Sequence, residues 1–210
     1  MRIIICVLLL TFCSVCFAQD DDIPTYHNKW ESFAKMKEQD LRADLATFTL
    51  GGLDESMGKQ QLSYIPVSDY GDDYVEFLQD NIHVKITSAK FDKTKHKLQY
   101  YDQYVVRIDN KPFYGVDGQM PRKKIESIAV TIGNDSVQIP PAAFFDLYEP
   151  RFCASDASTG KIACNTRLYI SNDKRKIYIY MLNSSGRGGY EVTWVIEDKK
   201  YLRRVIDYDF

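Results

Sequence analysis

One segment near the C-terminus, Ile177-Tyr178-Ile179-Tyr180-Met181, is apolar or aromatic at every position. Side chains of a strand alternate between the two faces of its sheet, so this segment is expected to be an interior strand that is covered on both faces. Residues 182–189, which include the Gly-containing link 184–189, separate it from the next run, Tyr190 to Ile196. Because a helical crossover needs about a dozen residues, the two runs are expected to pair as antiparallel neighbours. Their shared buried face would hold Ile177, Ile179, Met181, Val192, Trp194 and Ile196.

Other runs with strand character lie on both sides of this pair. Tyr201 to Ile206 is expected to form a hairpin with Tyr190 to Ile196, and Arg167 to Ile170 to pair with Lys176 to Leu182. The earlier strands are expected from about residue 82 onward, at Ile82 to Ile86, at Leu98 to Ile108 before the turn pair Asp109-Asn110, and at Ile125 to Ile132 with a return through Val137 and Ile139.

The segment from Trp30 to about Leu50 is expected to be helical. It is rich in Glu, Lys, Ala, Leu and Met and contains no Pro or Gly, and Gly51-Gly52 should end it. We therefore predict a mainly β fold for residues 19–210 as a single domain. The strands would form an antiparallel sheet, a sandwich or a partly closed barrel, with the N-terminal helix packed on it.

Residues 1–18 are typical of a cleavable secretory signal peptide. Arg2 gives a positive start, the apolar run from Ile3 to Val15 is too short for a comfortable membrane span, and small side chains permit a cut before Gln19. A buried N-terminal strand or helix is the alternative, but three acidic residues follow the run at once. The mature chain is expected to be exported to the periplasm, the cell surface or the exterior, without a transmembrane span.

A lipid anchor is a second alternative for the N-terminus. Cys13 or Cys16 could carry it, although Cys16 lacks the usual Leu three residues before it. Cys16 followed by Gln19 and Asp20-Asp21-Asp22 resembles the acidic export tags of surface lipoproteins in Bacteroidota. A soluble form is expected, and a form anchored through Cys16 stays open.

The expected mature chain keeps two cysteines, Cys153 and Cys164. An even pair in an oxidising compartment normally forms a disulfide. It would close a loop of about a dozen residues and contribute about 3 kcal/mol in the chain-entropy model. A redox or metal role would need C-x-x-C spacing or a nearby His, and the sequence offers neither. A structural disulfide is therefore predicted.

Three further stretches carry a resemblance to known sequences. They are VRIDNKPFYG at 106–115, IPPAAFFDLY at 139–148 and GYEVTWVI at 189–196. Together they resemble a group of exported, uncharacterised proteins of Bacteroidota. The resemblance implies export and a bacterial origin, and it implies no activity, ligand or catalytic residue.

The candidates for catalysis and metal binding are weak. His27, His83 and His96 lie too far apart for a zinc motif and are expected to be solvated. No G-x-S-x-G elbow is present, and the acidic clusters 20–22 and 69–73 do not fit a calcium loop. No catalytic residue, cofactor site or metal site is therefore predicted. Asp109 and Asp117 flank an aromatic loop, but a glycosidase pair depends on a measured separation that sequence does not supply.

Nucleic acid is not an expected partner. The formal net charge is -2, and two of the three basic steps, 122–124, 174–176 and 199–204, lie at predicted hairpin turns. The Gly-rich loop 184–189 lacks the phosphate-loop motif and precedes a strand, so it is expected to be a connector.

Tyrosine is the remaining feature, because the chain has 15 of them. Core packing is the expected role for about half of those in predicted strands, and the others could form an aromatic platform for a protein or a glycan. The tyrosines concerned are Tyr100, Tyr101, Tyr104, Tyr169, Tyr178, Tyr180, Tyr190 and Tyr201. The expected function is a non-catalytic binding or structural module of the bacterial cell envelope or exterior. An exported hydrolase acting on glycan or peptide and a secreted inhibitor are the alternatives.

Overall fold

The structure is a computed structural model that describes residues 25–26, 35–52, 58–155, 158–183 and 188–208 of the 210-residue chain. The expected signal peptide and the residues from Trp30 to Ala34 lie outside these ranges. The description below concerns the described residues only.

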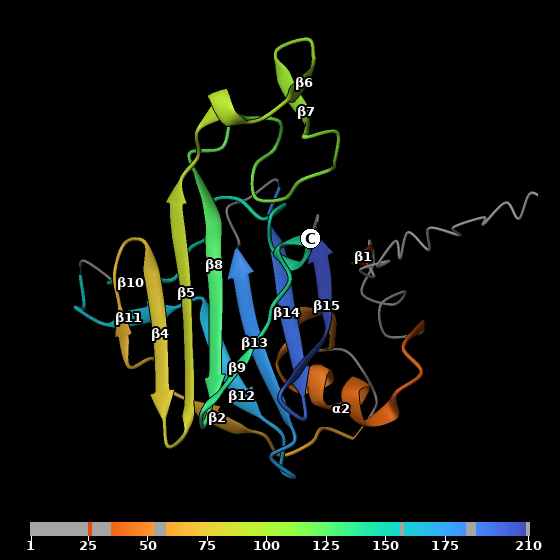
Figure 1. Ribbon diagram of the computed structural model, residues 1–210, viewed down its shortest axis with the longest axis vertical. Coiled ribbons are helices and arrows are strands. Elements are labelled where there is room, and N and C mark those ends of the chain that lie inside the picture. Colours follow the sequence, from red (N-terminus) through yellow and green to blue (C-terminus); the bar gives the residue numbers. More distant parts are fainter. Residues whose placement is uncertain (1–24, 27–34, 53–57, 156–157, 184–187, 209–210) are drawn as a thin grey trace, which may run out of the picture.

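Two antiparallel sheets form most of the molecule (Figure 1). The first has the order β1-β15-β14-β13-β12-β2, and only the β1–β15 pair is parallel. Its strands are β1 (Thr25–Tyr26), β2 (Ser63–Ile65), β12 (Thr166–Ile170), β13 (Lys176–Asn183), β14 (Tyr190–Glu197) and β15 (Lys200–Tyr208). The second has the order β3-β4-β5-β8-β9, with β3 (Asp69–Tyr70), β4 (Tyr74–Gln79), β5 (Ile82–Lys90), β8 (Lys123–Ile132) and β9 (Asp135–Val137).

The two sheets pack face to face around one hydrophobic cluster. Phe77 and Ile86 come from the second sheet, and Ile179, Val192 and Trp194 come from the first. The predicted mainly β fold is confirmed, and of the three arrangements left open the described strands form a sandwich and do not close into a barrel. Alternating side chains on strands of both sheets meet in this way in aligned β-sandwiches.

The predicted pairing of the C-terminal strands is confirmed. In the β13–β14 register Ile177 faces Ile196, Ile179 faces Trp194, and Met181 faces Val192. All six side chains are buried in the cluster between the sheets. The hairpins β14–β15 and β12–β13 also form as predicted.

The opposite face of the first sheet is covered by the helix α2 (Gln39–Phe48). Leu41 and Leu45 pack with Tyr178 and Val195 in a second cluster, so both faces of β13 and β14 are buried, as predicted for β13. The helix is packed on the sheet as expected (Figure 1).

The predicted helix from Trp30 to about Leu50 is interrupted within its described part: Lys35 is helical, residues 36–38 are not, and α2 begins at Gln39. Glu38 has an extended backbone, and Met36 is buried in the same cluster as Leu41 and Leu45. Its C-terminal end agrees with the prediction. The backbone nitrogen of Thr49 donates the last helical hydrogen bond to the Leu45 carbonyl oxygen, and the short 3₁₀ turn η1 (Leu50–Gly52) follows. A Cβ on Gly52 would lie 2.2 Å from the Cα of Ala46, so this close approach requires glycine.

Two strand predictions were wrong. Strands occur well before residue 82, at β2, β3 and β4. The sequence did not predict them because they are short, and β2 is defined by its distant partner β12. The expected single strand from Leu98 to Ile108 is a hairpin of β6 (Leu98–Tyr101) and β7 (Tyr104–Ile108). Its turn contains Asp102 at φ 54°, without the Gly or Asn that normally signals such a turn.

The remaining elements are short. The hairpin β10 (Cys153–Ser155) and β11 (Ile162–Cys164) forms a separate two-stranded sheet. The 3₁₀ turns in this part of the chain are η2 (Lys93–Lys95) and η3 (Pro141–Ala143).

Candidate functional site

The structure divides the strand tyrosines into three groups. Tyr178, Tyr180 and Tyr190 are buried, and Tyr169 and Tyr201 are half-buried. Tyr100, Tyr101 and Tyr104 are exposed, by 55%, 77% and 48%. The exposed three all lie on the β6–β7 hairpin, which we call the tyrosine hairpin.

The tyrosine hairpin projects from one end of the sandwich (Figure 1). Tyr101 and Tyr104 face each other across the two strands next to the turn, and Tyr100 faces Val105. Val106 lies at the irregularity in the register and is also exposed. Rigid aromatic side chains on a projecting element give contact area to a partner at low cost in conformational entropy.

A small hydrophobic cluster fixes the base of the hairpin. Val105 and Ile108, on the other face of β7, are buried with Phe91 and Tyr148. The rings of Phe91 and Tyr148 meet edge to face, with centroids 5.4 Å apart. The exposed tyrosines are thus carried by an element with its own packed support.

Backbone contacts with the loop after the hairpin add to this support. The backbone nitrogen of Val105 donates to the carbonyl oxygen of Gly118 at 2.8 Å. Gly118 has φ 67°, and a Cβ there would lie 2.9 Å from the Tyr104 ring. Glycine at this position therefore lets the ring of Tyr104 lie against the loop.

The two described histidines are each paired with a carboxylate. His96 Nδ1 lies 2.6 Å from Asp109 Oδ2, and its ring stacks on Phe91. Its side chain is only 19% exposed, so the expectation of a solvated histidine was wrong for His96. His83 Nε2 lies 2.5 Å from Glu76, on the outer face of the second sheet. His27 lies outside the described residues.

The carboxylates singled out from the sequence have separate surroundings. Asp109 also accepts from the backbone nitrogen of Lys97, which ties the end of β7 to the start of the hairpin. Asp117 lines a different hollow together with Arg122 and Glu149. Asp69 accepts from the Tyr74 hydroxyl and the Tyr70 backbone. Over the ranges that the structure describes, no three His, Cys, Asp or Glu side chains are placed to hold a metal ion.

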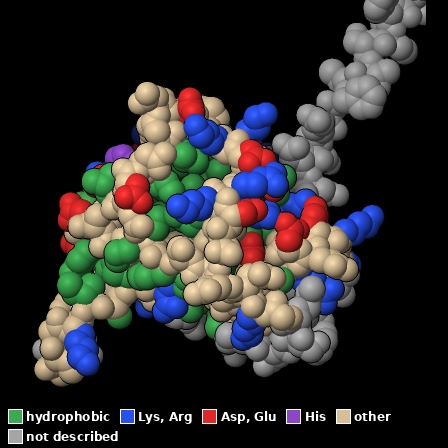
Figure 2. All heavy atoms as spheres, turned by 90° about the horizontal axis from the view of Figure 1, so that it is seen from below, with side chains coloured by type: hydrophobic (Ala, Val, Ile, Leu, Met, Phe, Trp, Pro, Cys, Tyr) green, Lys and Arg blue, Asp and Glu red, His purple; other side chains and the backbone are tan. Residues whose placement is uncertain are grey.

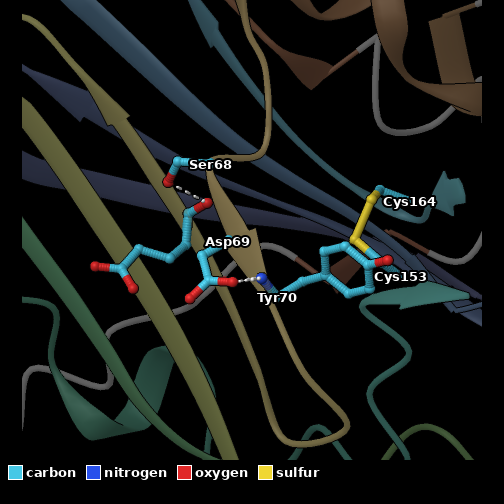
Figure 3. The surroundings of a disulfide bond; sticks show 6 residues. Ser68, Asp69, Tyr70, Cys153 and Cys164 are labelled. Atoms are coloured by element: carbon cyan, nitrogen blue, oxygen red, sulfur yellow. Dashed lines mark hydrogen bonds between the residues drawn. A yellow bond between two sulfur atoms is a disulfide. The ribbon is translucent and has the colours of Figure 1, made fainter.

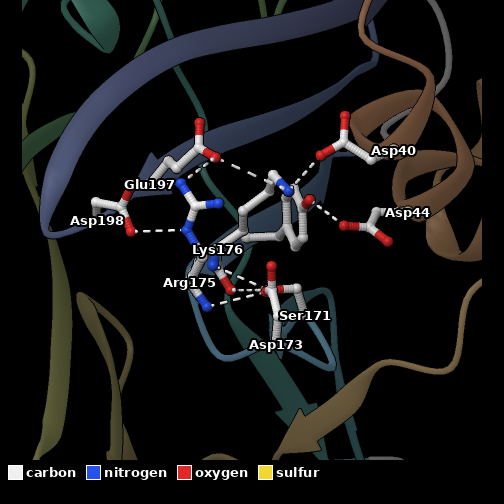
Figure 4. A network of polar contacts seen from close by, with 9 residues as sticks. Asp40, Asp44, Ser171, Asp173, Arg175, Lys176, Glu197 and Asp198 are labelled. Atoms are coloured by element: carbon white, nitrogen blue, oxygen red, sulfur yellow. Dashed lines mark hydrogen bonds and ion pairs between the residues drawn. The ribbon is translucent and has the colours of Figure 1, made fainter.

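A network of charged groups joins α2 to the first sheet (Figure 4). Lys176 Nζ lies 2.5 Å from Asp40 and 3.9 Å from Glu197. The hydroxyl of Tyr178 donates to Asp44. Burial raises the pKa of Asp44, whereas the hydrogen bond from Lys176 lowers the pKa of Asp40. Lys176 and Tyr178 on β13 thus contact Asp40 and Asp44 on α2, which is the arrangement of a structural link between helix and sheet.

Cys153 and Cys164 form the predicted disulfide (Figure 3). They face each other in the β10–β11 register, with Cα atoms 4.0 Å apart. The ring of Tyr70 lies beside the bond, and Cys153 packs at the edge of the central cluster. The disulfide therefore links β10 to β11 within one small hairpin, at the edge of the sandwich.

Charges of both signs are interspersed on the end of the molecule that Figure 2 shows. Lys199 pairs with Asp135, and Arg175 pairs with Asp198 at the predicted hairpin turns. No described helix is long and apolar enough to cross a membrane. Two of the basic steps thus have acidic partners in the fold.

Comparison with protein-family models, with curated proteins and with solved structures gave no match to this chain. Any function assigned to the chain must therefore come from the geometry of its surfaces.

Sequence reasoning missed one exposed aromatic, Tyr64 on β2, which is 50% exposed. It faces Tyr169 across the β2–β12 pair. The signal was small, because a strand of three residues has too little alternation to stand out.

Proposed function

We propose that the chain is a non-catalytic binding module of the bacterial cell envelope or exterior, and that the tyrosine hairpin docks onto a partner protein. The observation that carries the proposal is the concentration of Tyr100, Tyr101 and Tyr104 at the exposed end of one supported hairpin. Buried tyrosines stabilise the sandwich, but these three contribute little to its core. Tyrosine is enriched at protein interfaces because its ring is apolar and its hydroxyl forms hydrogen bonds.

The shape of the hairpin favours a protein over a small ligand. Small molecules bind in concave sites that bury most of their surface. The tyrosine hairpin is a projecting element (Figure 1), so its partner must supply the concave surface. A groove on another protein meets that requirement.

Site-specific photo-crosslinking in the native host tests this proposal. A photoreactive amino acid replaces Val106, which is exposed on the hairpin between the tyrosines and the base. The matched control carries the same amino acid at Leu78, which is 61% exposed on β4. We expect a discrete adduct of defined mass from position 106 and none from position 78. Absence of an adduct at position 106, or the same adducts from both positions, would overturn the proposal.

Export is tested separately. The secretory pattern of residues 1–18 supports a cut before Gln19. N-terminal sequencing or intact mass of protein from the native host should find Gln19 as the first residue. Retention of Met1 would refute export by this route, and a diacylated Cys16 would replace the soluble form with the anchored one.

A further inference from the structure

A second surface, separate from the tyrosine hairpin, is an open groove of about 830 Å³ beside the disulfide. Its floor is the outer face of β2 and β12, and one wall is β11 with Ile162 and Cys164. Val67, Ser68 and Asp69, at and just before β3, form the other wall. The volume lies within the range of about 300–1,000 Å³ that is typical of small-ligand sites.

Two tyrosine rings form the floor of the groove. Tyr64 and Tyr169 are directly opposite each other on neighbouring strands, so both rings lie on the outer face of the sheet. Their centroids are 5.7 Å apart and their planes are tilted by 54°. Half of the Tyr64 surface is exposed to the groove side of the sheet.

The Tyr169 ring is held in place from the protein side. Phe48, the last residue of α2, stacks on it with centroids 4.5 Å apart and an interplanar angle of 18°. Phe48 is itself packed edge-on against Tyr180, which is buried. The aromatic floor is therefore preorganised, because little side-chain freedom remains to be lost on binding.

Polar groups lie next to these rings. Arg167 is two residues before Tyr169 on β12, shares its face and is exposed. A hydrogen bond with the Tyr169 hydroxyl raises the pKa of Arg167, and Arg167 forms no ion pair with any described residue. The backbone of Asn165 is fixed on both sides, through its nitrogen to Phe152 and its oxygen to Leu182, and Asn165 lines the groove.

We infer that this groove binds a pyranose unit of a glycan, with the sugar ring on Tyr64 and Tyr169 and its hydroxyl groups toward Arg167 and Asn165. A pyranose has one face of C–H groups and a rim of hydroxyls. The C–H face matches the negative face of an aromatic ring. The rim needs a few fixed donors and acceptors, which a guanidinium and an amide supply.

The groove suits a sugar better than a purely apolar ligand. Arg167 is exposed and its guanidinium carries several N–H donors, which an apolar ligand would bury without partners. Asp69, on the opposite wall, already accepts from Tyr74 and Tyr70 and is not needed for the ligand. The inference is independent of the proposed hairpin interface, because the two surfaces use different elements.

A glycan array of neutral and uronic-acid-containing oligosaccharides provides the test, followed by titration calorimetry with the oligosaccharide that binds best. Tyr64→Ser removes the exposed ring, and Arg167→Gln removes the charge while keeping an amide donor. Tyr101→Ser is the matched control, because it removes an exposed tyrosine from the hairpin instead. We expect binding to weaken about tenfold with each groove variant and to stay unchanged in the control.

Three results would overturn the inference. The first is no binding to any oligosaccharide on the array by the oxidised, folded protein. The second is that Tyr64→Ser binds the oligosaccharide with the same affinity as wild type and has the same thermal midpoint. The third is loss of binding with Tyr101→Ser only, which would move glycan recognition to the hairpin and leave the groove without a role. If the protein prefers uronic-acid sugars and Arg167→Gln loses that preference, the result supports the inference and shows that Arg167 binds the carboxylate of the sugar.

Discussion

The indole nitrogen of Trp194 donates a 2.8 Å hydrogen bond to the carbonyl oxygen of Ala143, 51 residues earlier in the chain. Trp194 is fully buried between the two sheets, and Ala143 ends the 3₁₀ turn η3. This bond joins the centre of the first sheet to the segment that leads to Tyr148, at the base of the tyrosine hairpin. The core and the support of the candidate site are thus linked through one side chain.

Trp194→Ala should lower the free energy of unfolding by about 3–5 kcal/mol, the usual cost of emptying a buried aromatic site. Trp194→Phe is the control, because it keeps part of the packing and removes the bond to Ala143, so its cost should be smaller. Chemical denaturation of both variants gives the two values. A Trp194→Ala variant as stable as wild type would show that the side chain does not form the core.

Arg204 is the cross-strand neighbour of Trp194 and forms a buried two-point ion pair with Asp146, at 2.5 Å and 3.0 Å. Arg204→Met leaves Asp146 charged and unpaired, which should cost about 3–5 kcal/mol. Adding Asp146→Leu should recover much of that loss, because no buried charge remains. Urea denaturation of the single and double variants measures the difference. If the double variant were less stable than Arg204→Met, the pair would not be coupled as the contacts imply.

Because Cys153 and Cys164 form a disulfide, we expect reductant to increase the intact mass of the protein by two hydrogens. Replacing both Cys153 and Cys164 with Ser should lower stability by up to about 3 kcal/mol, because the unfolded chain gains the entropy of an open loop. The measurement is intact mass followed by thermal unfolding. Free thiols that alkylate without reductant would contradict the disulfide.

Asp40 and Asp44 should give opposite pH dependence. Burial raises the folded-state pKa of Asp44, so its contribution destabilises the fold as pH rises from the unfolded value through the raised one. Asp44→Asn keeps an acceptor for Tyr178, so its stability relative to wild type should increase over that window. The hydrogen bond from Lys176 lowers the pKa of Asp40, so the stability it contributes is lost as pH falls through that lowered value.

Urea denaturation from about pH 2 to pH 8 checks both signs. The stability of Asp40→Asn relative to wild type should fall as pH rises through the lowered pKa and then level off. Two variants with the same pH dependence would show that the environments of the two carboxyls have been assigned wrongly.

The pairing of β13 and β14 could be predicted because two local facts determined it. One strand was apolar on both faces, and the connection was too short for a crossover. The disulfide followed from a count of two cysteines in an expected oxidising compartment. Neither inference needed knowledge of distant contacts.

The tyrosine hairpin was harder to predict, because Asp102 adopts a positive φ in a turn that lacks the usual Gly or Asn. Sequence also could not tell which tyrosines would be exposed. Tyr178 is buried because α2 covers its face, and Tyr101 is exposed because nothing described packs on the end of the hairpin. Exposure is thus decided by elements far away in the chain. The groove could not be predicted for the same reason, because its floor is formed by β2 and β12, which are separated by about a hundred residues in the chain.

The central claim is that Tyr100, Tyr101 and Tyr104 serve recognition and not stability. The most direct measurement changes all three to Ser in the protein that carries the photoreactive residue at position 106, and follows adduct formation and unfolding together. Surface substitutions usually change stability by less than about 0.5 kcal/mol each, so the free energy of unfolding should fall by no more than about 1.5 kcal/mol while the adduct disappears. An adduct that persists at full yield would contradict the claim, and so would a loss of stability as large as that expected for Trp194→Ala.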